Sequence, residues 1–176
     1  MTVSHKKNHK RKLLLLLIPA VGLLCILILA VDWHSGNNKS LDPDETVTKP
    51  ESRAEAMGDE GDGKLEQEGG GGATSLTYAD EVTVNLNTGK IKLLFGNPSR
   101  ANYNAVVQVL LQDEVIGISG RLEPGYQVRE LSLDKKLKLS PGEYEGKLQV
   151  YFYDPATDER AMVNASIPVT ITVKKR

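Results

Sequence analysis

Histidine and cysteine are scarce in this chain, and their positions exclude most catalytic chemistry. The 176 residues include three histidines and one cysteine. The histidines all precede residue 35, and Cys25 lies within a long apolar run. Residues 76–176 therefore have neither side chain, which excludes disulfides, Ser–His and Cys–His catalysis and nearly all zinc sites in that region. We expect a non-enzymatic protein that uses no cofactor and no metal.

Acidic side chains are missing from the first two of four consecutive segments of the chain. Residues 1–12 hold five Lys or Arg and no acid, and residues 13–31 have no charged side chain. Residues 35–75 have a net charge of −6 and no aromatic residue, whereas residues 76–176 have a net charge of +1. A nucleic-acid-binding domain needs a basic surface with interleaved aromatic residues. The lysines at 135, 136 and 138 and the basic residues 174–176 are therefore expected to be solvated charges, with no nucleic-acid partner.

Residues 13–31 are a continuous apolar run of Leu, Ile, Val, Ala, Gly, Cys and one Pro. A helix of this length spans roughly 28 Å, which is close to the thickness of the hydrocarbon layer. Trp33 follows, where an aromatic ring suits the headgroup layer. The basic residues lie on the N-terminal side, so the positive-inside rule places residues 1–12 in the cytoplasm. The sequence predicts a single-pass signal anchor in the cell membrane, with the remaining chain extracytoplasmic.

Two other interpretations of this segment stay open. It can be a signal peptide that is cleaved near Ala30, which would release a secreted protein, although a signal core is usually shorter. It can also be a lipoprotein signal that uses Cys25, although Leu24 stands where a small residue is expected.

Residues 32–75 have the composition of a linker. The part from 35 to 75 contains eight glycines, including the run Gly69–Gly72, and ten acids. Such a segment buries too little apolar surface to offset its ordering entropy. We therefore expect a disordered, acidic, Gly-rich tether, with a root-mean-square reach of roughly 35 Å for about forty residues. Calcium at Asp59, Glu60 and Asp62 is not expected, because the glycine spacing does not fit a calcium loop.

From residue 76 onward the apolar residues alternate with polar ones, which is typical of strands. The clearest alternations are at 82–86, 91–95, 107–111 and 163–173. Turn chemistry separates them, as in Asn87-Thr88-Gly89 and Leu122-Glu123-Pro124-Gly125. The phase slips between Val128 and Leu131, which indicates a bulge, and Pro168 indicates an edge or a bulge. The prediction for residues 76–176 is an all-β sandwich of seven to eight strands.

Residues 80–173 resemble bacterial immunoglobulin-like surface modules, including the cell adhesion-related domain of bacteria. The features that carry the resemblance are Asn97 after an early strand, the turn Leu122–Gly125, the stretch Pro141–Tyr144 before a late strand, and Asp154 at its end. The resemblance implies an immunoglobulin-like fold and a role in adhesion or interaction at the cell surface.

Three tyrosines in the strand that follows Pro141 carry the expectations about sites. Tyr144 shares parity with Leu148, Val150 and Phe152 and is expected to face inward, with its hydroxyl on a preceding loop carbonyl. Tyr151 and Tyr153 have the opposite parity and are expected to face solvent. Two such rings can bind a sugar or anchor a protein, or they can simply pack across strands.

Acidic residues at Asp154, Asp158 and Glu159 are interpreted as turn residues, because a tight hairpin offers no catalytic cleft. The leading functional hypothesis is a non-enzymatic module that binds an extracellular protein or polysaccharide through residues such as Tyr151. The alternative is a structural accessory subunit that adds its sheet edge to a larger envelope machine, for example one linked to a mobile element or to secretion.

Overall fold

The computed structural model describes residues 42–58, 64–65 and 74–175, and this part of the chain is almost entirely β-structure. One short helix, α2 (Pro43–Thr46), precedes the strands. The strands are β1 (Glu55–Ala56), β2 (Thr77–Tyr78), β3 (Glu81–Asn85), β4 (Lys90–Asn97), β5 (Asn104–Leu111), β6 (Glu114–Ile118), β7 (Tyr126–Ser132), β8 (Gly142–Tyr153) and β9 (Arg160–Lys174). The all-β prediction is confirmed for these residues.

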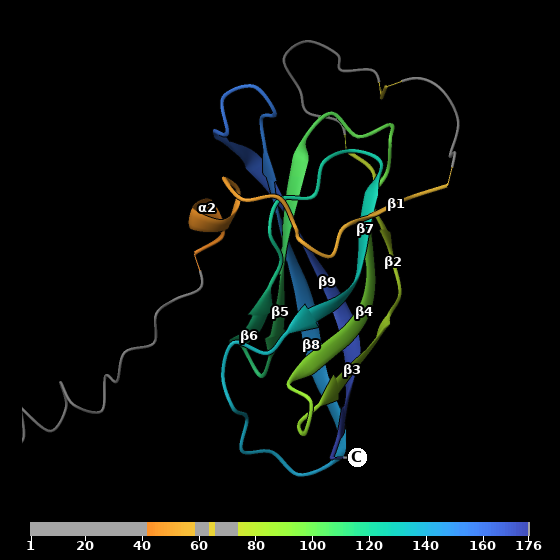
Figure 1. The fold of residues 1–176 in the computed structure, drawn as a ribbon, viewed down its shortest axis with the longest axis vertical. Coiled ribbons are helices and arrows are strands. Elements are labelled where there is room, and N and C mark those ends of the chain that lie inside the picture. The colour runs from red at the N-terminus through yellow and green to blue at the C-terminus, as the bar shows by residue number, and fades with distance from the viewer. Residues whose placement is uncertain (1–41, 59–63, 66–73, 176) are drawn as a thin grey trace, which may run out of the picture. The chain divides into compact units, whose positions relative to one another are not determined.

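The strands form one mixed sheet in the order β1-β7-β4-β3-β9-β8-β5-β6, with β2 beside β4. β3 and β9 pair in parallel, and the other pairs are antiparallel. The sheet curls at the β3–β9 junction, so that β4 and β7 face β5 and β8 (Figure 1). β1-β7-β4-β3 and β9-β8-β5-β6 are thus two layers, in the strand order of an immunoglobulin-like sandwich. β1 occupies the edge position that the fourth strand of the first layer normally takes.

The core lies between these layers and follows the predicted alternation. Alternate residues of β3, β4, β5, β8 and β9 point inward and are almost fully buried. The buried set includes Val82, Val84, Ile91, Phe95, Val107, Val109, Leu148, Val150, Phe152, Ile171 and Val173. Because side chains in a strand alternate between faces, this periodicity is the signal that a sequence transmits most directly.

The bulge predicted from the phase slip between Val128 and Leu131 is present. Ile91 of β4 pairs with Leu131, and Phe95 pairs with Val128, with a register shift between Lys92 and Phe95. β4 therefore contributes one more residue than β7 at this point, which keeps Val128 and Leu131 in the core despite their odd spacing.

Three predicted turns are also confirmed. Gly89 has a φ of 65°, and the Asn85 side chain accepts hydrogen bonds from the backbone amides of Asn87 and Thr88. Gly125, with a φ of 91°, ends the turn that begins at Leu122. The Asp154 carboxylate accepts from the amides of Ala156 and Thr157, so it stabilises the β8–β9 hairpin turn. We call the end of the sandwich that carries the β8–β9 turn the hairpin end, and the end that carries Gly89 the β3–β4 end.

Residues 42–58 differ from the predicted tether, and we call them the N-terminal strap. Pro43 and Val47 are buried against the sandwich. Pro50 forms a bridge to Arg121, the Glu51 amide donates to the Arg121 carbonyl at 2.9 Å, and β1 pairs with β7. Figure 1 shows the strap crossing the hairpin end. The predicted disordered tether is therefore wrong over 42–58, whereas its parts at 32–41, 59–63 and 66–73 lie outside the described residues.

Specific contacts explain why this polar segment is ordered. Asp42 caps α2 by accepting from the Asp44 amide at 2.9 Å, and Pro43 stands at the first helical position, where its missing N–H costs nothing. The Glu51 carboxylate accepts from the amides of Arg53 and Gly120 at 2.9 and 2.7 Å. These bonds satisfy backbone groups of the strap, and such specific bonds cannot be predicted from the amino-acid composition of the segment.

Replacing Gly120 with alanine should detach the strap while the sandwich stays folded. A Cβ at Gly120 would lie 2.7 Å from the Lys49 carbonyl oxygen and 2.9 Å from the Glu51 backbone, so the strap must move. We expect a loss of about 1–3 kcal/mol in unfolding free energy. Hydrogen exchange should lose amide protection in residues 47–57. Gly58→Ala is the matched control, because its Cβ would meet nothing within 4 Å. Unchanged protection in Gly120→Ala would contradict the docked strap.

No helix in the described part of the chain has the length and apolar character needed to cross a membrane. The predicted membrane helix at 13–31 and the cytoplasmic tail at 1–12 lie outside the described residues.

Candidate protein-interaction surface

Tyr151 and Tyr153 lie on the face of β8 opposite Phe152, as their parity predicts, but only one of them reaches solvent. Tyr153 is 1% exposed and packs with Val106 and Val47 in a small second core. The N-terminal strap covers it, and its hydroxyl donates to the Asp44 carboxylate at 2.6 Å. Burial and the neighbouring carboxylate raise the pKa of Tyr153 well above its usual value. The prediction that Tyr153 faces solvent is therefore wrong, and the two rings do not form an exposed platform.

Tyr151 is half-buried beside this second core, and Arg160 stacks on it with the guanidinium 4.1 Å from the ring centroid. The first residues of β9 bulge next to this pair. Tyr151 pairs with Asn164 and Tyr153 with Arg160, so three residues of β9 oppose one residue of β8. The bulge carries Met162 and Val163, which are 98% and 57% exposed. Exposed apolar side chains beside a stacked tyrosine are typical of contact surfaces.

The adjoining part of β9 is a free sheet edge within the described part of the chain. β9 pairs with β8 along most of its length, but with β3 only from Thr170 to Lys174. The Thr170 amide donates toward β3, to the Asp80 carbonyl. Because backbone groups of a strand alternate sides, those of Asn164 and Ser166 also point to the β3 side, where no described strand meets them. Pro168 falls on this free edge, in agreement with the edge position predicted from sequence.

β2 does not pair with this edge of β9. Continuing the parallel register from Glu81↔Thr170 brings Tyr78 level with Ile167. β2 instead follows β4, through the pairs Thr77↔Gly96 and Tyr78↔Phe95, so the two strands diverge. Tyr78 is 47% exposed and Ile167 is half-buried, although both have the parity of core residues. This part of β9 therefore has partly exposed apolar side chains beside backbone groups that no described strand pairs with.

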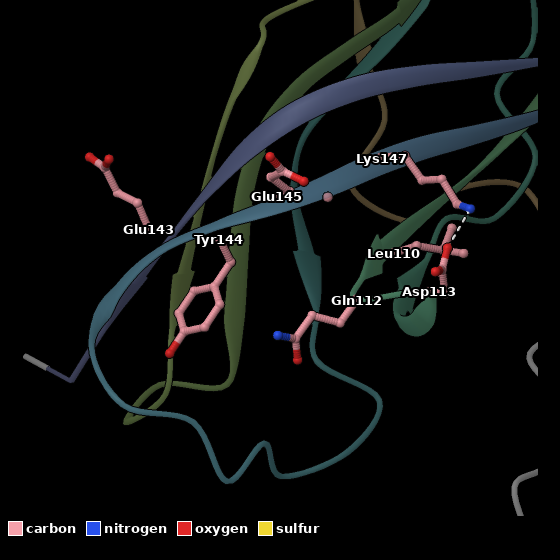
Figure 2. Close-up of a pocket in the computed structure, with 8 residues that line it drawn as sticks. Leu110, Gln112, Asp113, Glu143, Tyr144, Glu145 and Lys147 are labelled. Atoms are coloured by element: carbon pink, nitrogen blue, oxygen red, sulfur yellow. Dashed lines mark hydrogen bonds and ion pairs between the residues drawn. The ribbon is translucent and has the colours of Figure 1, made fainter.

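Tyr144 is a structural residue at the opposite end of β8. Its ring is partly buried against the main core, and its hydroxyl donates to the Ser140 carbonyl at 2.9 Å. The predicted contact with a preceding loop carbonyl is confirmed. Figure 2 shows the hollow that Tyr144 lines, in which Lys147 pairs with Asp113 at 2.7 Å while Glu143 points away from that pair. The hydrogen bond from Lys147 lowers the pKa of Asp113.

The acidic residues of the β8–β9 hairpin are occupied with local structure. Asp154 holds the turn, and Asp158 lies 3.9 Å from Arg121. Within the described ranges, no three His, Cys, Asp or Glu side chains are close enough together to hold a metal ion.

The sequence did not reveal the apolar bulge or the length of the free edge. Val163 belongs to the predicted inward alternation of 163–173, and it is exposed because three residues of β9 oppose Phe152 alone. The one available signal was Pro168, which marks an edge but does not say how far the edge extends.

No protein-family profile matches this chain, and no curated protein matches it. Two solved structures are similar. The E. coli chaperone DraB has 20% identity and a TM-score of 0.40, over 58% of this chain and 55% of that one. AggA, the major subunit of aggregative adherence fimbriae type I from Escherichia coli, has 13% identity and a TM-score of 0.31, over 58% of this chain and 95% of that one. The matched region thus spans about half of the chaperone, and the fold assignment depends on the strand order.

Proposed function

We propose that this protein is a non-enzymatic module that binds a partner protein outside the cell, held to the membrane by a single helix at 13–31. The feature that supports the proposal is the open edge of β9 beside Met162 and Val163. An added strand can pair with Asn164 and Ser166 and cover the exposed ring of Tyr78. The apolar run, the basic residues before it and the absence of His and Cys from 76–176 support the anchor and the non-enzymatic role.

The surface favours a protein over a polysaccharide. Sugar binding depended on a platform of Tyr151 and Tyr153, and Tyr153 is buried. A free edge offers backbone hydrogen bonds, and an exposed apolar bulge offers side-chain contact, which together match an extended peptide segment. This combines the two hypotheses from sequence: a surface interaction module, and a subunit that contributes its sheet edge to a larger assembly.

Ser166→Pro should abolish binding of the partner without unfolding the domain. The Ser166 amide points to the open side, so proline removes a donor that β8 does not use. With a photo-crosslinking residue at Met162 on intact cells, we expect one defined protein adduct, reduced at least fivefold by Ser166→Pro. The unfolding free energy should change by less than about 1 kcal/mol.

Ser166→Ala is the matched control, since it removes the hydroxyl and keeps the amide. A crosslinker at exposed Lys92, on the other layer, should give no such adduct. Equal adducts from Ser166→Pro and Ser166→Ala would show that the backbone edge does not bind the partner. Adducts that form only after cell lysis would contradict the extracytoplasmic location.

A further inference from the structure

The two lysine clusters of the sequence come together at the β3–β4 end of the sandwich. Lys135, Lys136 and Lys138 precede β8, and Lys175 follows β9, yet all four line one hollow of about 620 Å³. The β3–β4 turn joins them. The Leu133 amide donates to the Gly89 carbonyl at 2.8 Å, and the Asn87 side chain donates to the Lys175 carbonyl at 2.8 Å. From the sequence alone, both clusters are predicted to be solvated charge.

Alternation in residues 133–139 explains how the lysines are presented. Leu133, Leu137 and Leu139 are partly buried against the main core and form the apolar floor of the hollow. Lys136 and Lys138 lie between them in sequence and are exposed. The segment is therefore held in place by its leucines, and its ammonium groups stand around the floor.

The hollow has an excess of positive charge. Lys135 pairs with Glu114, but no ion pair among the described residues involves Lys136, Lys138 or Lys175. Asp134 also lines the hollow, and its carboxylate is bound by the backbone amide of Ile118 on β6. Because residues 76–176 carry a net charge of only +1, this is a local concentration of basic groups.

The acidic residues of the chain's own N-terminal part cannot neutralise the hollow. Asp59, Glu60 and Asp62 lie between Met57, whose amide donates to the Gly125 carbonyl, and Lys64, whose ammonium donates to the Ser99 carbonyl. Both anchors are at the hairpin end. The eight residues of β4 separate that end from Gly89 by about 23 Å. A five-residue segment tied at both ends extends at most about 11 Å.

Glu66 and Glu68 are limited in the same way. Leu65 donates to the Arg100 carbonyl and β2 begins opposite Gly96, so both ends of this segment are again at the hairpin end. Glu66 and Glu68 follow Leu65 by one and three residues, so their backbone lies at most about 11 Å from it. Residues 33–41 contain no acid. The hollow is therefore open to a negatively charged group of another molecule.

We propose that this hollow binds a linear polyanion that carries phosphate groups. Lysine ammonium groups bind phosphate oxygens as point charges and need no fixed geometry, which suits a chain with repeated charges. A concave site fits a segment of a polymer better than it fits the flat surface of a membrane. The site is separate from the β9 edge and does not depend on the function proposed there.

The test uses the full chain in nanodiscs of neutral lipid and fluorescent inorganic polyphosphate as the probe. Anisotropy should show binding that weakens about 20- to 40-fold when salt rises from 50 to 200 mM, as expected for about three released counterions. Replacing Lys136, Lys138 and Lys175 with glutamine should weaken binding at least tenfold. The matched control replaces exposed Lys49, Lys92 and Arg100 with glutamine, which removes the same charge elsewhere. It should change binding by less than twofold.

Three outcomes would overturn the proposal. One is the absence of binding at low salt, and another is an equal loss in the two triple variants, which would show non-specific attraction. The third is displacement of polyphosphate by soluble short-chain phosphatidylglycerol at an equal phosphate concentration, which would assign the hollow to lipid headgroups. Circular dichroism melts of both variants would establish that they remain folded.

Discussion

Tyr153→Ala should lower the free energy of unfolding by about 3–5 kcal/mol, the range for truncating a large buried aromatic residue. Tyr153 is 1% exposed and packs against Val106 of β5 and Val47 of the N-terminal strap. Its removal leaves a cavity between the sheet and the strap, and it also breaks the hydroxyl bond to Asp44. Denaturant melts followed by circular dichroism would measure the loss.

Two further variants separate the contribution of the Tyr153 hydroxyl from that of its ring, and the effect of full burial from that of partial burial. Tyr153→Phe keeps the ring and should cost about 1–2 kcal/mol, because the bond that is lost has a carboxylate acceptor. Tyr144→Ala should cost less than Tyr153→Ala, since the Tyr144 ring is only partly buried. If Tyr144→Ala were the more destabilising change, the strap would not cover Tyr153 in solution.

Asn97→Ala should destabilise the protein by about 2–4 kcal/mol, although it removes only a small polar group. The Asn97 side chain is fully buried, and its amide donates to the carbonyls of Tyr103 and Leu122, both at 2.9 Å. These bonds join the end of β4 to the loops that follow β4 and β6. Alanine removes both bonds and leaves the Tyr103 carbonyl without this donor, whereas the Leu122 carbonyl keeps the Ala105 amide; a urea titration would record the shift in midpoint.

Asn97→Asp is the informative companion variant. An ionised carboxylate cannot donate to either carbonyl, so we expect it to be at least as destabilising as alanine. Among the described residues, no donor reaches the amide oxygen of Asn97, so the position uses the donor side of the amide. If the Asn97→Asp variant were as stable as the unmodified protein, the amide would be oriented the other way.

Strand parity could be read from the sequence, but the covering of each face could not. Alternation correctly placed Leu148, Val150 and Phe152 inside and put Tyr153 on the opposite face. Parity says which side a residue faces, and the N-terminal strap, which covers that side near the hairpin end, comes from a hundred residues earlier. Its ordering depends on a few long-range bonds, such as Gly120 to Glu51, that composition does not reveal.

The candidate surfaces show the same limit. Pro168 correctly marked an edge, because proline cannot donate to a neighbouring strand. The outward turn of Met162 and Val163 depends on a bulge that has no turn residue of its own. The hollow at the β3–β4 end depends on tertiary structure that brings Lys175 beside Lys136 and Lys138.

The docked N-terminal strap shortens the linker between the domain and its proposed membrane anchor. If the predicted membrane helix ends at Val31 and Asp32 follows it, only the nine residues 33–41 lie between Asp32 and the strap. Nine residues span at most about 32 Å when fully extended, whereas the forty-three residues of the predicted tether after Asp32 would span at most about 150 Å. The shorter reach confines the domain to a smaller volume, which raises its effective concentration toward neighbours in the same membrane. A linker this short suits encounters within the plane of one membrane, whereas the longer tether predicted from sequence would have suited capture of a partner at a distance.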